Sequence, residues 1–163
     1  MPARLPSLSA AEEAEILAGA RAGRAARGEA FERIFRATRE PVLAVCLHLT
    51  GRRGDAEDAA TEVFHALHRG IAGVTGESRL TTWVYRIALR ASFRARARAR
   101  ARRLDGAPAP LACLPAGPRA VLALFAIDGI RSGEVADILG IPEDAVWSRL
   151  HAARKMLAEV QPG

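Results

Sequence analysis

Charged side chains that could bind a partner are concentrated in two stretches of the sequence. In the first, DAEDAATEVFHALHRG at residues 55–70, Asp55, Asp58, Glu62, His65 and Arg69 follow one another at offsets of 3, 7, 10 and 14 from Asp55. This spacing places them on one face of a helix. The helix dipole favours carboxylates near a helix N-terminus. The residues alone therefore allow either a solvated face or a surface that docks a basic protein.

The second stretch, RARARARARR at residues 94–103, alternates arginine with alanine. A period of two is typical of a strand, but both residue types have high helix propensity, and neither Gly nor Pro occurs between Leu80 and Gly106. We expect the run to continue a helix that begins near Leu80. Because arginines two positions apart are rotated by about 200°, they surround the helix without leaving an apolar face. They are either solvated or bound to phosphates.

No group of residues has the spacing of an active site. His65 and His68 form an isolated pair three residues apart, whereas zinc sites use three or four ligands. A phosphate-binding glycine loop and a nucleophile elbow are absent. Cys46 and Cys113 lack metal-ligand spacing, and we expect both to be reduced core thiols. The sequence thus predicts a binding protein that is not an enzyme and uses neither a cofactor nor a metal.

Apolar periodicity identifies the elements that must position the charged residues. In residues 55–70 one buried helical stripe is expected, formed by Ala56, Ala59, Ala60, Val63, Phe64 and Leu67. From Leu80 onward, Val84, Ile87, Ala88 and Ala91 recur at helical spacing. Alternating apolar runs bounded by hairpin turns do not occur, so we predict an all-α fold.

The C-terminal part has the pattern of a helix-turn-helix. A short helix is expected within 118–127, a second over 132–139 and a third from Pro142, with Gly140 in the turn. The third helix would pack Val146, Leu150, Ala153 and Leu157 inward. Its outward face would hold Asp144, Ser148, His151, Ala152 and Lys155, with Arg149 on one flank. Short polar and basic side chains there suit a DNA major groove, although helical bundles that do not bind DNA show the same pattern.

A proline-rich stretch divides the chain. The segment LDGAPAPLACLPAGP, residues 104–118, contains four prolines and two glycines, which interrupt helices. We therefore predict two small helical domains, at 1–103 and 118–163, joined by a linker at 104–117. Residues 1–103 hold 19 positive and 11 negative side chains, net +8, whereas residues 104–163 hold 5 and 7, net −2. The overall charge of +6 favours an acidic partner such as nucleic acid.

The sequence gives no indication of membrane insertion. It lacks an apolar run of the roughly 20 residues that a membrane span needs. Near the N-terminus, Glu12, Glu13 and Glu15 stand where a signal peptide would have its apolar core. We therefore expect a cytoplasmic protein.

Three segments together resemble the extracytoplasmic-function (ECF) group of bacterial sigma-70 family factors. They are DAEDAATEVFHALHRG, GESRLTTWVYRIAL and LPAGPRAVLALFAIDGIRSGEVADILGIPEDAVWSRLHAARKML, and the resemblance extends from about Glu29 to Glu159. It implies a region 2-like bundle that binds core RNA polymerase and the −10 promoter element, and a region 4-like helix-turn-helix that binds the −35 element. The implied function is transcription initiation with help in DNA melting. The implied partners are bacterial core RNA polymerase, promoter DNA and an anti-sigma factor.

The resemblance also implies roles for individual residues. Core polymerase would dock on Asp55, Asp58, Thr61 and Glu62. The capture loop, GIAGVTGESRL at residues 70–80, would hold an unstacked base of the −10 element. This loop and the following helix would bind the −10 element through Gly76, Glu77, Ser78, Arg79, Trp83, Arg86 and Arg90. Beyond them, the helix end would contact phosphates through Arg94, Arg96, Arg98 and Arg100. The −35 element would be approached by Ser148, Arg149, Ala152 and Lys155.

The sequence departs from the family pattern at several of these places. Thr61 stands where the family usually has Gln, and Val74, Thr75, Leu80 and Thr81 replace the usual aromatic and basic residues of the capture loop. In the recognition helix, Asp144, Ala145, Val146 and Trp147 replace Gly-Thr-Val-Lys, and Ala152 replaces a frequent arginine. We predict weak autonomous DNA binding by this half, because phosphate neutralisation supplies most nonspecific affinity. Trp147 either packs on the bundle or contacts DNA or a partner. These departures leave an alternative function open. The chain would then be a sigma-like protein with altered or weakened promoter recognition that acts as a polymerase-binding or helix-turn-helix regulator.

Overall fold

The computed structural model of the chain describes residues 8–102, 111, 113–127 and 129–160. Within these residues every regular element is helical, which confirms the all-α prediction. The elements are α1 (Ala10–Ala22), α2 (Arg24–Thr50), α3 (Arg53–Gly70), the 3₁₀ turn η1 (Ile71–Gly73), α4 (Leu80–Ala101), α5 (Ala116–Val121), the π-helical turn η2 (Leu122–Ile127), α6 (Ser132–Leu139) and α7 (Glu143–Val160). No helix in the described part of the chain is both long enough and apolar enough to cross a membrane.

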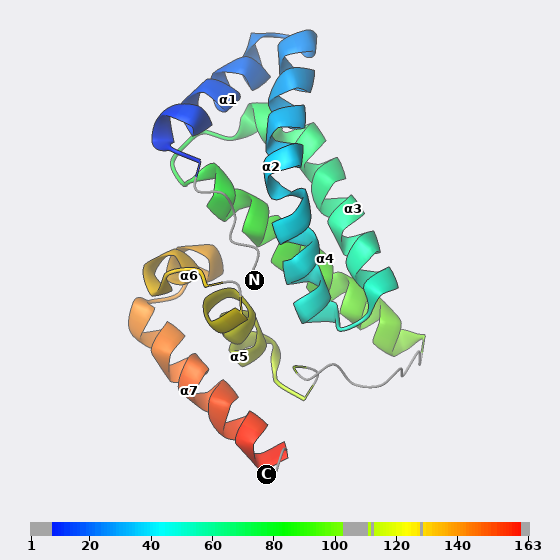
Figure 1. Ribbon diagram of the computed structural model, residues 1–163, viewed down its shortest axis with the longest axis vertical. Coiled ribbons are helices and arrows are strands. Elements are labelled where there is room, and N and C mark those ends of the chain that lie inside the picture. Colours follow the sequence, from blue (N-terminus) through cyan, green and yellow to red (C-terminus); the bar gives the residue numbers. More distant parts are fainter. Residues whose placement is uncertain (1–7, 103–110, 112, 128, 161–163) are drawn as a thin grey trace.

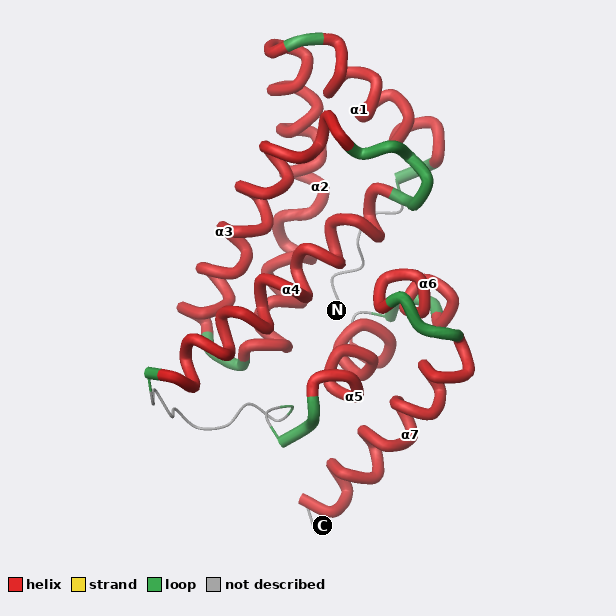
Figure 2. Tube along the Cα trace, turned by 180° about the vertical axis from the view of Figure 1, so that it is seen from behind, coloured by secondary structure: helices red, strands yellow, loops and turns green. Residues whose placement is uncertain are grey.

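Helices α1 to α4 form a bundle around the first apolar core (Figures 1 and 2). The predicted stripe of α3 is confirmed, since Ala56, Ala59, Ala60, Val63 and Leu67 are buried and Phe64 is half-buried against them. This stripe packs on α2 and α4, so the polar side of α3 faces outward. The acidic residues of α3 are therefore placed by the burial of the alanines between them.

Helix α4 contains nearly all of the arginine and alanine run. The run is helical up to Ala101, as its propensities predict, and Arg103 lies outside the described residues. The prediction that the run lacks an apolar face is wrong at its start. Ala95 is only 3% exposed and belongs to the first core. Alanine between arginines lets the helix pack closely at that point.

The C-terminal helices form the predicted helix-turn-helix. Helix α6 ends at Gly140, whose backbone has φ +64 and whose N–H donates to the carbonyl of Ala136. This left-handed conformation closes the turn before α7. Val146, Leu150 and Ala153 of α7 are buried as predicted, whereas Leu157 is only partly buried.

The second apolar core joins the two halves of the chain. It contains residues of α5, η2, α6 and α7, but also Val45 and Leu49 of α2 and Tyr85 and Leu89 of α4. Helix α6 accordingly lies beside α4 (Figure 1). Most of the predicted linker, 104–117, falls outside the described residues. The division into domains at that linker stays a prediction, while the described helices share an apolar core across it.

The end of the linker is attached to α5 by a buried arginine. Arg119 is 5% exposed and donates from Nε to the carbonyl of Leu111 at 2.8 Å, and from Nη2 to the carbonyl of Leu114. Burial, with a smaller contribution from nearby Arg96, lowers the pKa of Arg119 to about 10. Both leucines belong to the second core. Arg119 thus holds the chain entering α5 against the bundle.

Candidate functional site

The four predicted docking residues of α3 differ in their exposure and in the contacts that they already make within the chain. Asp58 is exposed and has no hydrogen bond or ion pair with any residue that the structure describes. Asp55 lies 3.7 Å from Arg52 Nε, and only 20% of its side chain is exposed. The Thr61 hydroxyl donates to the carbonyl of Glu57 at 2.8 Å. Asp58 is therefore the carboxylate most available to an external cation.

Glu62 is bound by the arginine run. Its carboxylate forms an ion pair with Arg94, and its Oε2 lies 3.7 Å from Arg98 Nη2. The two arginines are one turn apart on α4, so both reach the same acid on α3. Two of the arginines predicted to contact phosphates, Arg94 and Arg98, thus form ion pairs between α4 and α3.

The remaining arginines of α4 have different surroundings. Arg96 is half-buried, and burial, followed by the nearby Arg100 charge, lowers its pKa. Arg90 and Arg100 are exposed, and neither pairs with another described residue. These two side chains are the freest cations on the helix.

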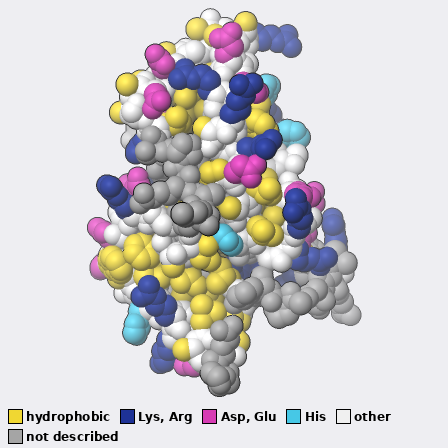
Figure 3. All heavy atoms as spheres, in the orientation of Figure 1, with side chains coloured by type: hydrophobic (Ala, Val, Ile, Leu, Met, Phe, Trp, Pro, Cys, Tyr) yellow, Lys and Arg dark blue, Asp and Glu magenta, His cyan; other side chains and the backbone are white. Residues whose placement is uncertain are grey.

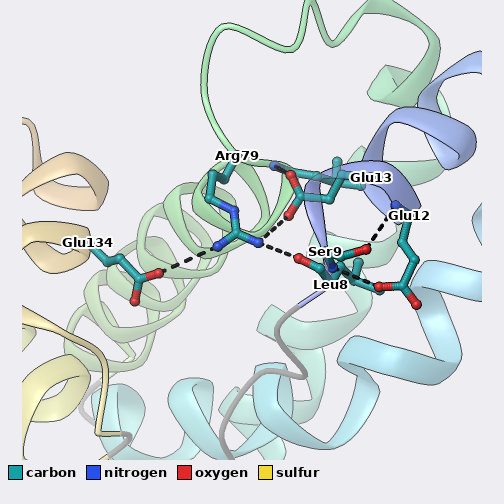
Figure 4. Close-up of polar contacts among 7 residues, drawn as sticks. Leu8, Ser9, Glu12, Glu13, Arg79 and Glu134 are labelled. Carbon is teal, nitrogen blue, oxygen red and sulfur yellow. Dashed lines mark hydrogen bonds and ion pairs between the residues drawn. The ribbon is translucent and has the colours of Figure 1, made fainter.

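The irregular part of the predicted capture loop, residues 74–79 between η1 and α4, is attached to α1 at both ends. Arg21, in the last turn of α1, donates to the carbonyl of Val74. At the other end, Glu13 Oε2 accepts from the backbone N–H of Leu80 at 3.1 Å, and its Oε1 lies 3.2 Å from Arg79 Nη2 (Figure 4). Of the predicted loop residues, Gly76 and Glu77 are exposed and Ser78 is half-buried. The loop therefore presents its tip to solvent from a fixed base.

Arg79 joins three parts of the chain. Besides Glu13, it donates to the carbonyl of Leu8, and its Nη1 lies 3.8 Å from Glu134 Oε1 in α6 (Figure 4). Since 43% of its side chain is exposed, its contacts with Leu8 and Glu134 lie at the surface, whereas the contact with Glu13 is partly buried. A DNA contact by this guanidinium would compete with bonds that it already makes.

Arg86 also reaches α6. Its Nε lies 3.4 Å from the carbonyl of Ile138, and its Nη2 donates to the carbonyl of Asp137. Both carbonyls are in the last turn of α6, where a helix leaves acceptors without partners and its dipole favours a cation. Two residues predicted to bind the −10 element, Arg79 and Arg86, are therefore in contact with the helix-turn-helix.

Trp83 is half-buried in the first turn of α4 and packs on the end of α3. A Cβ added to Gly70 would lie 3.1 Å from Cζ2 of the indole, which is tighter than most real Cβ contacts and would require the ring to shift slightly. The glycine thus makes room for the ring. One face of Trp83 is fixed by the protein, while the rest of the side chain remains accessible.

The residues predicted to meet the −35 element lie on α7. Ser148 and Lys155 are exposed, and Ala152 is half-buried. Arg149 is half-buried and lies against Gly117 of α5, where an added Cβ would be 3.3 Å from its Nη1. Ser148 donates to the carbonyl of Asp144 at 3.1 Å. Lys155 is the one residue of this set that presents an exposed charge.

Trp147 stands beside this face. Its side chain is 49% exposed, and its ring meets Phe125 edge-on, with centroids 5.1 Å apart. The packing alternative thus holds for one edge of the ring, while the rest of the residue is exposed and its contact with DNA or a partner stays a prediction. Apolar side chains gather on the surface of α5 to α7, whereas charges of both signs alternate over α1 to α4 (Figure 3).

The histidines and cysteines do not form a metal or catalytic site in the part of the chain that the structure describes. Among the described residues, no group of three or more His, Cys, Asp or Glu side chains could hold a metal ion. His68 instead packs edge-on against Phe31, with centroids 5.2 Å apart. Cys46 is buried as expected, and burial raises the pKa of its thiol to about 11. Cys113 is exposed, so the prediction of a core thiol is wrong there.

Sequence reasoning missed Glu13 and Arg21. They are separated from their loop partners by 67 and 53 residues. Periodicity identifies neighbours along one helix, and it has no signal for a contact between remote segments. Only the packing of α1 beside the loop brings these residues to it.

Comparisons with known proteins match both halves of the chain. Sigma-70 region 2 matches residues 34–103, and sigma-70 region 4 matches residues 111–157. The ECF RNA polymerase sigma factor SigG of Mycobacterium tuberculosis, in two strains, is 30% identical over 172 aligned residues, which cover 76% of this chain and 46% of SigG. The chain thus spans about half the length of this relative.

Two solved structures share the arrangement of the helices. CnrH, in complex with the cytosolic domain of CnrY, superposes with a TM-score of 0.75 and 25% identity over 91% of this chain and 96% of that one. The sigma factor RpoE of Bartonella quintana, in complex with the anti-sigma factor NepR, superposes with a TM-score of 0.64 over 79% of this chain and 94% of that one. At 21% identity, the second likeness shows the fold alone.

Proposed function

Because the chain belongs to the sigma-70 family, in its ECF group, we propose that it binds bacterial core RNA polymerase and directs it to specific promoters. Members of this family are transcription factors and not enzymes. The observation that carries the proposal is that regions 2 and 4 occur in one chain, in the family's order, with an exposed acid on the outer face of α3 that pairs with no described residue. We further propose a cytoplasmic location, where the polymerase is.

Docking on the polymerase centres on Asp58. Its carboxylate is exposed and without a described partner, so a basic surface can bind it without breaking an internal bond. Asp55 and Thr61 flank it and already have contacts within α3 or at its start. Glu62 holds α4 through Arg94 and Arg98, which makes it a structural acid as well as a docking residue.

Recognition of the −10 element uses the loop and the start of α4. Gly76, Glu77 and Ser78 lie at the tip, where an unstacked base would be bound, and Trp83, Arg86 and Arg90 continue along α4. Arg86 is bound to the end of α6, so it becomes free for DNA only when α6 moves away. Arg100 and the outer arginines of the run would then follow the phosphates.

Recognition of the −35 element is assigned to Ser148, Arg149, Ala152 and Lys155 on α7. Only Lys155 supplies an exposed charge here, and Asp144 adds a carboxylate at the start of the same helix. This supports the second candidate, a sigma-like protein that binds polymerase with altered or weakened promoter recognition. Transcription from a set of promoters by the reconstituted holoenzyme distinguishes the two.

An anti-sigma factor is the proposed regulatory partner. CnrH and the Bartonella RpoE were each solved in complex with another protein, the cytosolic domain of CnrY and the anti-sigma factor NepR respectively. The likeness of this chain to CnrH covers nearly its whole described fold. A protein that binds both halves at once would keep the polymerase-docking face and the DNA-binding faces out of use.

The test is co-elution of the purified chain with core RNA polymerase on a sizing column, which needs no knowledge of the promoter. Asp58→Lys should lose co-elution, because it replaces the free carboxylate with a like charge facing a basic surface. Reversing the charge of Glu62 with Glu62→Lys is less informative, since it also breaks the ion pairs with Arg94 and Arg98.

Glu40→Lys is the matched control. Glu40 is an exposed acid on α2 that pairs with its neighbour Arg39, so the charge change is the same at a different surface. This variant should co-elute like the wild type, and circular dichroism should show equal helicity for both variants. Retention of Asp58→Lys on the polymerase would refute the assigned docking face.

A further inference from the structure

We propose that α1 positions the capture loop for DNA, and that Glu13 and Arg21 are the positioning residues through which it does so. The inference rests on the proposed function, which assigns the loop to the −10 element. Helix α1 lies outside residues 34–103 that match sigma-70 region 2, so the family match does not account for it.

The loop has one anchor at each end, and both anchors are on α1. Arg21 binds the carbonyl of Val74 where the loop begins, and Glu13 binds the backbone N–H of Leu80 where it ends. Val74 and Leu80 are buried, whereas Thr75, Gly76 and Glu77 between them are exposed. Helix α1 therefore fixes the two ends and leaves the tip open to a ligand.

Glu13 supplies a cap that α4 does not provide for itself. The residue preceding α4 is Arg79, which makes no side-chain capping bond, although the first N–H groups of a helix have no partner within it. The carboxylate of Glu13 accepts from the Leu80 N–H, and the helix dipole favours a negative charge at this position. The same carboxylate pairs with Arg79, so one side chain fixes both the last loop residue and the first helical one.

Burial makes this arrangement specific. Glu13 is 8% exposed, and each carboxylate oxygen has its own partner, Leu80 N–H on Oε2 and Arg79 Nη2 on Oε1. A buried carboxylate without these partners would be costly, so Glu13 and the loop end stabilise one geometry together. Holding an unstacked base requires a pocket that is already formed, because ordering the loop on binding would reduce affinity.

The experiment uses the full chain assembled with core polymerase and a pool of single-stranded DNA with a short randomised block. The wild-type holoenzyme should enrich one base strongly at the captured position. Glu13→Ala should lower that enrichment about fivefold, the factor that corresponds to loss of a typical N-cap. Glu13→Gln keeps an oxygen for the Leu80 N–H but not the charge for Arg79, so it should restore part of the preference. Arg21→Gln, at the other end of the loop, should also weaken it.

Glu15→Ala is the matched control. Glu15 is on the same helix, 72% of its side chain is exposed, and it pairs with Arg33 of α2 instead of the loop. The base enrichment by the Glu15→Ala holoenzyme should equal that by the wild type, and all variants should co-elute with core polymerase. If Glu13→Ala does not assemble with the polymerase, the base preferences of the Glu13→Gln and Arg21→Gln holoenzymes test the positioning role.

Unchanged base preference in the Glu13 and Arg21 variants would overturn the positioning role while leaving the proposed function intact. A wild-type holoenzyme that enriches no base would instead overturn the assignment of the loop to the −10 element, and the inference with it. A loss of preference shared by Glu15→Ala would show a general effect of α1 stability and would also refute the specific role of Glu13.

Discussion

Neighbouring side chains of the same type have different roles in this chain. Asp58 and Glu62 are one helical turn apart on α3, yet Asp58 is free among the described residues, whereas Glu62 is bound by Arg94 and Arg98. Arg98 and Arg100 differ in the same way, since Arg98 is paired and Arg100 is exposed without a described partner. The function of a charge here depends on which partner the fold has already given it.

This difference predicts the contribution of each arginine to DNA binding. Arg100→Gln should reduce the slope of log binding constant against log salt by about 0.9, the contribution of one phosphate contact. Arg98→Gln should reduce it by less, because the Arg98 guanidinium already lies 3.7 Å from the Glu62 carboxylate. The measurement is binding of the full chain to duplex DNA of arbitrary sequence at a series of salt concentrations.

Circular dichroism should show that both variants are as helical as the wild type, since glutamine is a good helix former. Equal slopes for Arg100→Gln and the wild type would mean that the end of α4 is solvated and does not contact phosphates.

Single elements depend on a few positions where the backbone conformation is special. The turn between α6 and α7 requires Gly140, whose φ of +64 is unfavourable for residues with a Cβ. Gly133, in the first turn of α6, has no positive φ, and an added Cβ would meet nothing within 4 Å. The two glycines are chemically identical but differ in what the fold demands of them.

Gly140→Ala should therefore lower the free energy of unfolding by about 1 to 2 kcal/mol through backbone strain. Gly133→Ala should be neutral or raise it by about 0.5 to 1 kcal/mol, since alanine has the higher helix propensity. Urea unfolding of each variant measures both values. If the two substitutions have equal effects, backbone conformation is not what fixes the turn.

At the scale of the whole molecule, the two halves are joined by a shared apolar core and by polar bonds. Tyr85 and Leu89 of α4 pack in the same core as Val121, Leu124 and their neighbours in the C-terminal half. Arg86 and Arg79 add bonds to α6 around this core. The face of α4 assigned to the −10 element is therefore covered in part by the helix-turn-helix in this arrangement.

The two tryptophans allow this coupling to be measured, because Trp83 lies in α4 and Trp147 in α7. In variants that keep only one of them, with the other changed to Phe, urea unfolding followed by fluorescence should give coincident transitions. Leu89→Ala removes side-chain volume from the shared core, which typically costs about 2 to 5 kcal/mol, and should separate the two transitions.

Leu17→Ala is the matched control, because it removes the same side chain from the first core alone. Leu17 is buried in that core and does not belong to the second. Its loss should lower the free energy of unfolding without separating the transitions. Two separate transitions in the wild type would show that the halves unfold independently despite their contact.

The sequence by itself predicted the local structure. The stripe of α3, the continuation of α4 through the arginine run and the turn at Gly140 all follow from periodicity, helix propensity and the backbone freedom of glycine. These are properties of residues within a few turns of one another, so a single sequence contains the information. The resemblance of three ordered segments to the sigma-70 family identified the family, which the matches to regions 2 and 4 confirm, and its assignment of the candidate site to α3, α4 and α7 stays a prediction.

Only the tertiary structure decided which of the candidate residues are free. It paired Glu62 with Arg94, bound Arg86 to the end of α6 and brought Glu13 to the start of α4, whereas it left Asp58 exposed. Each of these pairs is 32 or more residues apart in the sequence. Such contacts depend on how apolar faces pack all the helices together, and the pattern along one helix does not record which remote side chain will face it.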